Sequence, residues 1–202
     1  MNLLLFSDLH CDVDAAHRMV ELSNQVDVVI GAGDFAICRR HIERTVNILS
    51  GIDKPTIVVP GNSESYEELE AACGQWASAH VLHGSGISIA GVEYYGLGGA
   101  VPVTPFGDWS YDMTEAEAGE LLASCPAGAV LVSHSPPKGV LDTSSAGRSL
   151  GSRAVLNAIH SKSPILVVCG HIHESGGKHA RIERTDVINA GPHGKVWELH
   201  VC

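Results

Sequence analysis

Residues 3–10 read LLLFSDLH, four apolar side chains followed at once by a serine and then by Asp8 and His10. A short run of this kind, bounded by residues that favour turns, is typical of a strand buried on both faces. Carboxylate and imidazole groups are ligands that metal ions use in proteins. The stretch therefore predicts a buried strand that leads into a metal-binding loop.

Four further stretches repeat this arrangement. They read DVVIGAGD, TIVVPGNS, AVLVSHSP and ILVVCGHIH, and they end in Asp34, Asn62, His134, and His171 with His173. In open α/β sheets, ligands bind outside the carboxyl ends of the strands, because the loops converge there. We therefore expect these side chains to meet Asp8 and His10 at one edge of a sheet. Seven oxygen and nitrogen ligands are enough for two metal ions that share a bridging residue.

A simpler explanation applies to each position taken alone. Asp and Asn favour the turns that end strands, so one polar residue behind an apolar run needs no metal. Five runs that end in the order Asp-x-His, Asp, Asn, His and His-x-His are much less readily explained by turns. The set as a whole favours a metal centre.

Length and composition predict a well-packed domain. The chain has 202 residues, of which 45% are hydrophobic and 18% charged, and this fits one domain over residues 1–202. The net charge of −10 argues against non-specific binding to nucleic acids or anionic membranes, which need a basic surface. It does not exclude a small anionic substrate, because bound divalent cations would dominate the field in their own pocket.

Cysteine usage and the start of the chain indicate a compartment. The six cysteines include no C-x-x-C pair, and several fall on or beside predicted buried elements. The chain begins directly with the first apolar run, without a signal peptide or a membrane span. We expect a soluble, cytoplasmic protein with free thiols. Its oligomeric state stays open.

The predicted elements alternate in the first half of the chain and then become shorter. Strands are expected at 2–7, 27–31, 55–60, 81–82, 87–90, 92–96, 129–133, 165–169, 179–183, 186–190 and 195–200. Helices are expected at 13–24, 39–50, from Ser63 or Ser65 to 74, at 114–124 and at 150–160. Irregular loops cover 98–112 and 138–148. This mixture predicts an α/β fold in which two sheets pack together with helices outside.

The motifs resemble a known family. Together, Asp8-Leu9-His10, Gly33-Asp34, Gly61-Asn62, His134 and Gly170-His171-Ile172-His173 resemble the signature of the calcineurin-like metallophosphoesterases. The resemblance implies a four-layer α/β/β/α sandwich of two mixed sheets flanked by helices. It also implies a ligand set for each of two ions. These sets are Asp8, His10, Asp34 and His173 for the first ion, and Asp34, Asn62, His134 and His171 for the second, with Asp34 as the bridge.

The chemistry of such a centre suits phosphate esters. Two ions about 3.5–4 Å apart acidify a bridging water, so that hydroxide can attack phosphorus, and they also clamp the phosphate. Mixed nitrogen and oxygen ligands suit manganese first, with iron, zinc, nickel or cobalt as alternatives. Among the ligands, we expect Asp34, Asn62 and His134 to act in catalysis as well.

One position departs from the family pattern. The family usually carries a histidine that protonates the leaving alcohol, and this chain has Ser63 in its place. A positioned general acid contributes about 10²–10⁴-fold to the rate, so its loss should matter most for poor leaving groups. Three consequences are open: a preference for good leaving groups or particular diesters, a substitute residue, or residual activity.

Several other residues are candidates for supporting roles. Substitutes for the acid are Glu64, His83 and His193; candidate phosphate clamps are Lys138 and Arg148; and Glu174 is a candidate to orient a metal-binding histidine. The aromatic residues Phe106, Trp109 and Tyr111 are candidates for stacking on a base or aryl ring. For most of these positions, a surface or structural role is an equally simple explanation.

The predicted function is that of a dinuclear-metal phosphoesterase, and a phosphodiesterase rather than a monoesterase. Its expected substrate is a small-molecule phosphate ester or a nucleotide, because no basic track is visible that would hold a nucleic acid strand. Two alternatives keep the same fold: a catalytically weak or inactive sensor of metal and nucleotide, and a protein-interaction scaffold. The complete ligand set argues against the scaffold.

Overall fold

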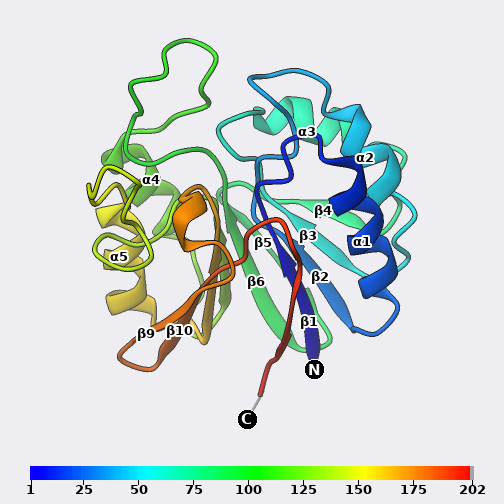
Figure 1. Ribbon diagram of the computed structural model, residues 1–202. Helices are drawn as coiled ribbons and strands as arrows, with labels where there is room; N and C mark the ends of the chain where they lie inside the picture. Colours follow the sequence, from blue (N-terminus) through cyan, green and yellow to red (C-terminus); the bar gives the residue numbers. More distant parts are fainter. Residues whose placement is uncertain (201–202) are drawn as a thin grey trace.

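Two β-sheets face each other at the centre of the molecule. The computed structural model describes residues 1–200 (Figure 1). The first sheet has the order β11 (Lys195–Glu198), β1 (Asn2–Phe6), β2 (Val28–Gly31), β3 (Thr56–Val58) and β4 (Ala79–Val81). The second has the order β5 (Ser85–Ile89), β6 (Val92–Leu97), β7 (Val130–Ser133), β8 (Leu166–Cys169), β10 (Thr185–Asn189) and β9 (His179–Ile182).

Both sheets are mixed, with a parallel centre. Strands β1 to β4 are parallel, and β11 joins β1 antiparallel. In the second sheet β6, β7, β8 and β10 are parallel, while β5 and β9 are antiparallel edge strands. The carboxyl ends of the parallel strands in each sheet therefore lie at a common edge, and their loops meet there.

Helices cover the outer faces. The helices α1 (Val13–Ser23), α2 (Glu43–Leu49) and α3 (Tyr66–Cys73) pack on the first sheet, and α4 (Glu115–Leu122) and α5 (Arg153–Lys162) pack on the second. Figure 1 shows these two helical layers on opposite sides of the sheets. The predicted four-layer α/β/β/α sandwich is confirmed. None of the helices within residues 1–200 has the length and apolarity to cross a membrane.

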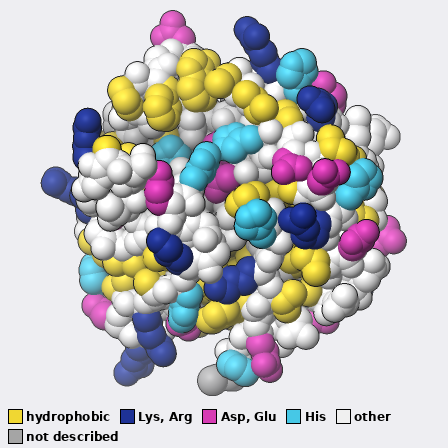
Figure 2. Space-filling view, in the orientation of Figure 1, with side chains coloured by type: hydrophobic (Ala, Val, Ile, Leu, Met, Phe, Trp, Pro, Cys, Tyr) yellow, Lys and Arg dark blue, Asp and Glu magenta, His cyan; other side chains and the backbone are white. Residues whose placement is uncertain are grey.

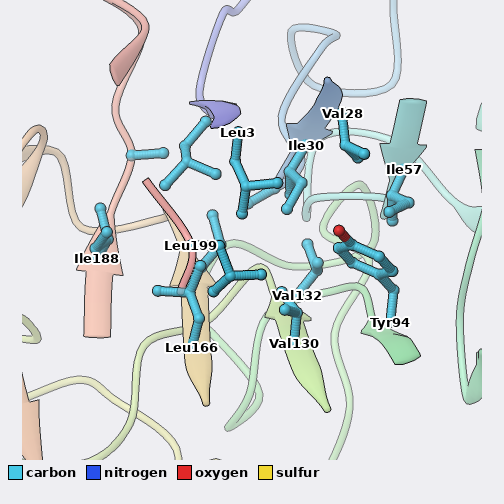
Figure 3. Packing of buried hydrophobic residues seen from close by; sticks show 14 of the residues in the cluster. Leu3, Val28, Ile30, Ile57, Tyr94, Val130, Val132, Leu166, Ile188 and Leu199 are labelled. Carbon is cyan, nitrogen blue, oxygen red and sulfur yellow. The ribbon is translucent and has the colours of Figure 1, made fainter. Parts of the chain in front are cut away.

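The alternation of strand side chains explains why the apolar runs are continuous. In β1, Leu3 and Leu5 enter the core between the sheets, whereas Leu4 and Phe6 pack beneath the helices. The other central strands divide their residues in the same way. Figure 3 shows the resulting inter-sheet core, in which side chains of the two sheets point toward one another. Both faces of these strands are buried, so most of their positions are apolar.

The helix starts follow capping chemistry. The side chain of Asp12 caps α1, while Ser65 with Glu68 and Thr114 with Glu117 form capping boxes at α3 and α4. Of the two predicted starts of the third helix, Ser63 and Ser65, the structure therefore selects Ser65.

The predicted helix at 39–50 was too long. Helix α2 begins only at Glu43, because Cys38, Arg39 and His41 have positive φ angles that a right-handed helix does not admit. The five cysteines within the described residues are free thiols, and Cys202 lies outside those residues.

The inter-sheet core generates a stability prediction. Val168 in β8 is fully buried between the sheets, whereas Val196 in β11 is 50% exposed. We expect Val168→Ala to lower the free energy of unfolding by about 2 kcal/mol, because two buried methyl groups are lost and a cavity is left. The matched Val196→Ala should change it by less than about 0.5 kcal/mol. Urea titration measures both, and equal losses would contradict this account of the core.

Candidate metal centre

The structure brings all seven predicted ligands together at the common edge of the two sheets. The first group joins residues behind β1, β2 and β8. His10 Nε2 lies 3.1 Å from His173 Nε2 and 3.4 Å from Asp34 Oδ2. His173 Nε2 lies 3.7 Å from Asp8 Oδ1. Ligand atoms of one ion, with bonds of about 2.1 Å, lie roughly 3.0–3.4 Å apart, so this spacing suits a shared cation.

The second group joins residues behind β2, β3, β7 and β8. Asn62 Oδ1 lies 3.0 Å from His171 Nδ1 and 3.3 Å from His134 Nε2. His134 Nε2 lies 3.6 Å from Asp34 Oδ1. Asp34 therefore turns one carboxylate oxygen toward each group. This division is the arrangement that a bridging carboxylate requires.

Hydrogen bonds orient the donor atoms. The Nδ1 atoms of His10 and His134 lie 3.1 and 2.8 Å from the carbonyl oxygens of Ala36 and Ala32. A carbonyl can only accept, so each Nδ1 carries the proton and each Nε2 keeps a free lone pair. The amide of Asn62 donates to Ser110 Oγ at 3.1 Å, which leaves its Oδ1 facing the histidines. These contacts fix the tautomers and the amide orientation that metal binding needs.

Glycines allow the ligand loops to approach closely. Gly33, Gly61 and Gly170 each precede a predicted ligand. A Cβ at Gly61 would collide with Asp34 Oδ1, and one at Gly170 would lie 2.6 Å from Asp8 Oδ2. The glycine before one ligand thus makes room for a second ligand from another strand. This packing explains the Gly-Asp, Gly-Asn and Gly-His pairs in physical terms.

Backbone strain concentrates at the same place. Asp8, His10, Asp34 and His171 have φ angles of 56°, 44°, 59° and 66°. Non-glycine residues in this left-handed region cost of order 1–3 kcal/mol each and persist only where their surroundings hold them. Four of the seven predicted ligands are therefore held in costly backbone conformations.

The electrostatics of the centre favour a cation. Asp8 and Asp34 are 6% and 3% exposed, and their only basic neighbours within 4 Å in the described chain are histidines. Burial raises the pKa of the Asp8 carboxyl. Burial acts in the same direction on Asp34, but the charges of His134 and His10 outweigh it and hold the pKa of Asp34 below its usual value. Burial and the neighbouring His134 lower the pKa of His171 to about 4, so its imidazole is neutral at pH 7. A buried carboxylate pair beside the neutral imidazole of His171 fits divalent metal ions.

Glu64 holds the backbone of two ligand loops together from the buried side of the centre. Its carboxylate is fully buried and accepts hydrogen bonds from the backbone N–H groups of Asp34, Ala36 and Gly61 at 2.8, 2.9 and 2.7 Å. Burial and the neighbouring Asp34 raise its pKa to about 7. Glu64 therefore ties the loop after β2 to the loop after β3. It does not line the cleft, and Ser65, not Glu64, caps α3.

Asn189 braces the His-x-His loop and was missed by the sequence analysis. It is fully buried at the end of β10, and its Nδ2 donates to the carbonyl oxygens of Gly170 and Ile172, both at 3.0 Å. Its Oδ1 has no hydrogen-bond partner within the described chain. The run Val187-Ile188-Asn189 repeats the pattern of apolar residues ended by a polar one, and that signal was available.

Three of the candidate supporting residues lie elsewhere. His83 accepts a hydrogen bond from Gly98 N through Nδ1 and contacts the Tyr111 hydroxyl through Nε2, so it packs the base of a loop. His193 is exposed in the turn after β10 and does not line the cleft. Lys138 donates to the carbonyl of Ser149. Neither histidine lines the cleft as a substitute for the missing acid, and Lys138 does not line it as a phosphate clamp.

The centre opens into a cleft of about 520 Å³. Its lining includes Ser63, Glu174 and five of the seven predicted ligands. Phe106 and Trp109 also line the cleft, and their rings stack with centroids 5.5 Å apart. Within residues 1–200, no hydrogen bond joins Glu174 to His171 or His173, so the predicted orienting contact is not observed. Figure 2 shows histidines gathered on this face beside acidic side chains, with hydrophobic side chains along its upper edge.

Comparison with known proteins assigns the family. The profile of the calcineurin-like phosphoesterase superfamily domain matches residues 1–200. The chain belongs to this superfamily. The calcineurin-like resemblance read from the five motifs is thereby confirmed. No match was found among curated protein sequences.

Solved structures with the calcineurin-like fold superpose on most of the chain. The protein TT1561 of Thermus thermophilus aligns with a TM-score of 0.76 and 20% identity, over 94% of this chain and 88% of that one. A dimetal phosphatase from Danio rerio aligns with a TM-score of 0.64 and 13% identity, over 94% and 86%. The phosphopantetheinyl hydrolase of Mycobacterium tuberculosis aligns with a TM-score of 0.60 and 14% identity, over 94% and 88%. At these identities the likeness shows the fold alone.

The bracing by Asn189 generates a prediction about metal affinity. We expect Asn189→Ala to weaken Mn²⁺ binding about 10–100-fold, because the loop that carries His171 and His173 loses two hydrogen bonds from beneath. Calorimetry on metal-stripped protein measures the affinity. Asn157→Ala, on the exposed face of α5, serves as the control and should leave it unchanged. A folded Asn189→Ala protein with wild-type affinity would contradict the bracing role.

Proposed function

We propose that this protein is a dinuclear-metal-dependent phosphodiesterase that acts on a small-molecule or nucleotide phosphate ester. The proposal rests on the orientation of the Asp34 carboxylate, whose two oxygens face two separate groups of donor atoms. Asp8, His10, Asp34 and His173 would hold one ion, and Asp34, Asn62, His134 and His171 the other. When bound, two divalent ions supply an activated water and neutralise charge on the phosphoryl oxygens.

The residues of the chain set the geometry of the reaction. The carbonyls of Ala32 and Ala36 fix two imidazoles, and Glu64 fixes the backbone beneath Asp34. The donor atoms are thus oriented before a substrate arrives, and such preorganisation lowers the reorganisation needed during reaction. The mixed nitrogen and oxygen donors are compatible with manganese, our first candidate, and equally with iron, zinc, nickel or cobalt.

The charge of the cleft supports a diester substrate. No lysine or arginine of the described chain lines the 520 Å³ cleft. A phosphate monoester carries up to two negative charges near pH 7, and a diester carries one. A cleft without basic side chains is better matched to the single charge, which two metal ions can neutralise alone.

Ser63 supports a substrate with a good leaving group. It is 3% exposed, it lines the cleft, and its backbone N–H donates to Asp34 Oδ1 at 2.8 Å. A serine hydroxyl is too weak an acid near pH 7 to give its proton to the leaving oxygen while the ester bond breaks. The same substitution favours the second candidate function, a sensor that binds metal and nucleotide but turns over slowly.

The proposed function is tested by hydrolysis of activated esters. We expect metal-stripped protein to hydrolyse bis-p-nitrophenyl phosphate only after Mn²⁺, Ni²⁺, Zn²⁺ or Mg²⁺ is added, and faster than it hydrolyses p-nitrophenyl phosphate. The Asp34→Asn change should lower the diester rate on the order of 10³-fold or more, because both groups lose their shared ligand. Asp53→Asn, at an exposed position, serves as the control. Metal binding without hydrolysis of these esters would favour the sensor.

Restoring a histidine tests the role of the missing acid. We expect Ser63→His to raise hydrolysis of diphenyl phosphate about 10²-fold while bis-p-nitrophenyl phosphate changes little, because only the poorer leaving group needs a proton. Ser63→Gln adds similar bulk without an acid and should not produce this difference. An equal rise for both esters would argue against general acid catalysis at this position.

A further inference from the structure

A second, smaller pocket opens from the metal cleft. It has a volume of about 260 Å³ and is lined by Pro102, Val103, Thr104, Pro105, Phe106, Ser144, Ala146, Arg148, Leu150 and His171. It shares Phe106, Ser144, Leu150 and His171 with the cleft of the metal centre. A ligand group in this pocket would therefore be continuous with a phosphate held near His171. For comparison, a dry cavity of about 150 Å³ holds a benzene ring.

The exposed large hydrophobic residues of the protein concentrate here. Five are more than 40% exposed within residues 1–200, and Ile37, Val103, Phe106 and Leu150 line the cleft or the pocket. The fifth, Val196, lies on β11 of the first sheet. Apolar side chains left exposed in contiguous patches mark sites of binding. This concentration favours an apolar ligand group beside the metal centre.

Both walls of the pocket are held in place by carboxylates. In the 98–112 loop, Asp112 accepts hydrogen bonds from Thr104 N at 2.7 Å and from Ser110 Oγ at 2.6 Å, and Ser110 Oγ in turn accepts from the amide of Asn62. In the opposite loop, the buried Asp142 accepts from the backbone N–H groups of Gly139 and Gly151 at 2.9 and 3.0 Å. The pocket is thus built from two braced loops, one of which is tied directly to a predicted metal ligand.

Arg148 is the one charged residue in the lining of this pocket. It lies on the short hairpin closed by the Thr143–Ser149 bridge. Within the described chain, its guanidinium makes no hydrogen bond or ion pair, although the protein carries a net charge of −10. A free guanidinium in the lining of an apolar pocket is complementary to an anionic group on an otherwise apolar ligand.

We propose that this pocket binds the ester substituent of the substrate, an apolar chain that carries an anionic group at its far end. The inference rests on the proposed function, because it assumes that the phosphate lies at the metal centre. Val103, Pro105 and Leu150 contact the chain, and Arg148 pairs with its anionic end. The metal centre selects the phosphodiester, and the pocket selects which diester.

The proposal is tested by binding, separately from catalysis. Calorimetry on the manganese-loaded protein compares methyl-, butyl- and hexylphosphonate. The affinity should rise about two- to fourfold per methylene, the upper figure corresponding to full burial of each CH₂. Val103→Asp should remove most of this rise, while Val196→Asp, at an equally exposed site on β11, should keep it. Measurable binding of methylphosphonate with no gain along the series would overturn the proposal.

The anionic end is tested with a matched pair of ligands. The affinity ratio of 5-carboxypentylphosphonate to hexylphosphonate should fall about two- to fivefold in Arg148→Gln relative to wild type, as for an exposed ion pair. An unchanged ratio would overturn the role of Arg148. A gain with chain length in a protein that hydrolyses no ester would leave the pocket standing and refute the phosphodiesterase instead.

Discussion

Two carboxylates buried without a lysine or arginine constrain the rest of this structure. Asp8 and Asp34 end neighbouring strands of the first sheet, and the basic side chains within 4 Å of them in the described chain are imidazoles. Burying an ionised carboxylate costs several kcal/mol unless an opposite charge and hydrogen bonds compensate it. Asp34 receives the N–H of Ser63, Asp8 receives the Ser7 hydroxyl and the N–H of His171, and histidines surround both. The remaining charge is what a pair of divalent cations would neutralise.

The surrounding architecture serves the same constraint. The seven predicted ligands follow five different strands, so the loops have to pack against one another at atomic contact. Glycines before the ligands, left-handed φ angles at four ligands and the buried Glu64 all act at this junction. Their costs are local, and they are balanced by an inter-sheet core in which nearly every side chain is buried. The stability that the core contributes therefore offsets the strain of the loops at the common edge of the sheets.

Much of this arrangement could be predicted from the sequence, for identifiable reasons. Strands buried on both faces leave unmistakable apolar runs, so the ends of β1, β2, β3, β7 and β8 were predicted within one or two residues. The edge at which the seven predicted ligands gather followed from those strand ends. The predicted start of helix α2 lay too early in the chain. Positive φ angles at Cys38, Arg39 and His41 delay the helix, and they depend on long-range contacts such as the hydrogen bond from Arg39 N to Ser63 O. Glu64 was a candidate substitute for the acid, and nothing in its neighbours along the chain reveals that it also accepts two hydrogen bonds from the loop after β2. The shapes of 98–112 and 138–148 also escaped prediction, because Asp112 and Asp142 organise them through hydrogen bonds inside irregular loops, which no pattern of apolar residues signals.

The replacement at Ser63 and the apolar character of the cleft bear on one question, namely how the centre would lower a barrier without an acid. A small hydroxyl stands where the superfamily usually carries a bulky, protonated ring, and the wall next to it contains Ile37, Cys38 and Trp109. Binding energy from parts of a substrate remote from phosphorus can be used to hold the reacting groups in position, and such positioning raises the rate independently of proton transfer. A site that gives up the acid gains most from substrates that supply such contacts and a stable leaving anion. Under the proposed function, the serine at position 63 and the apolar lining of the cleft would be two sides of one adaptation, a shift from leaving-group protonation toward recognition of the ester.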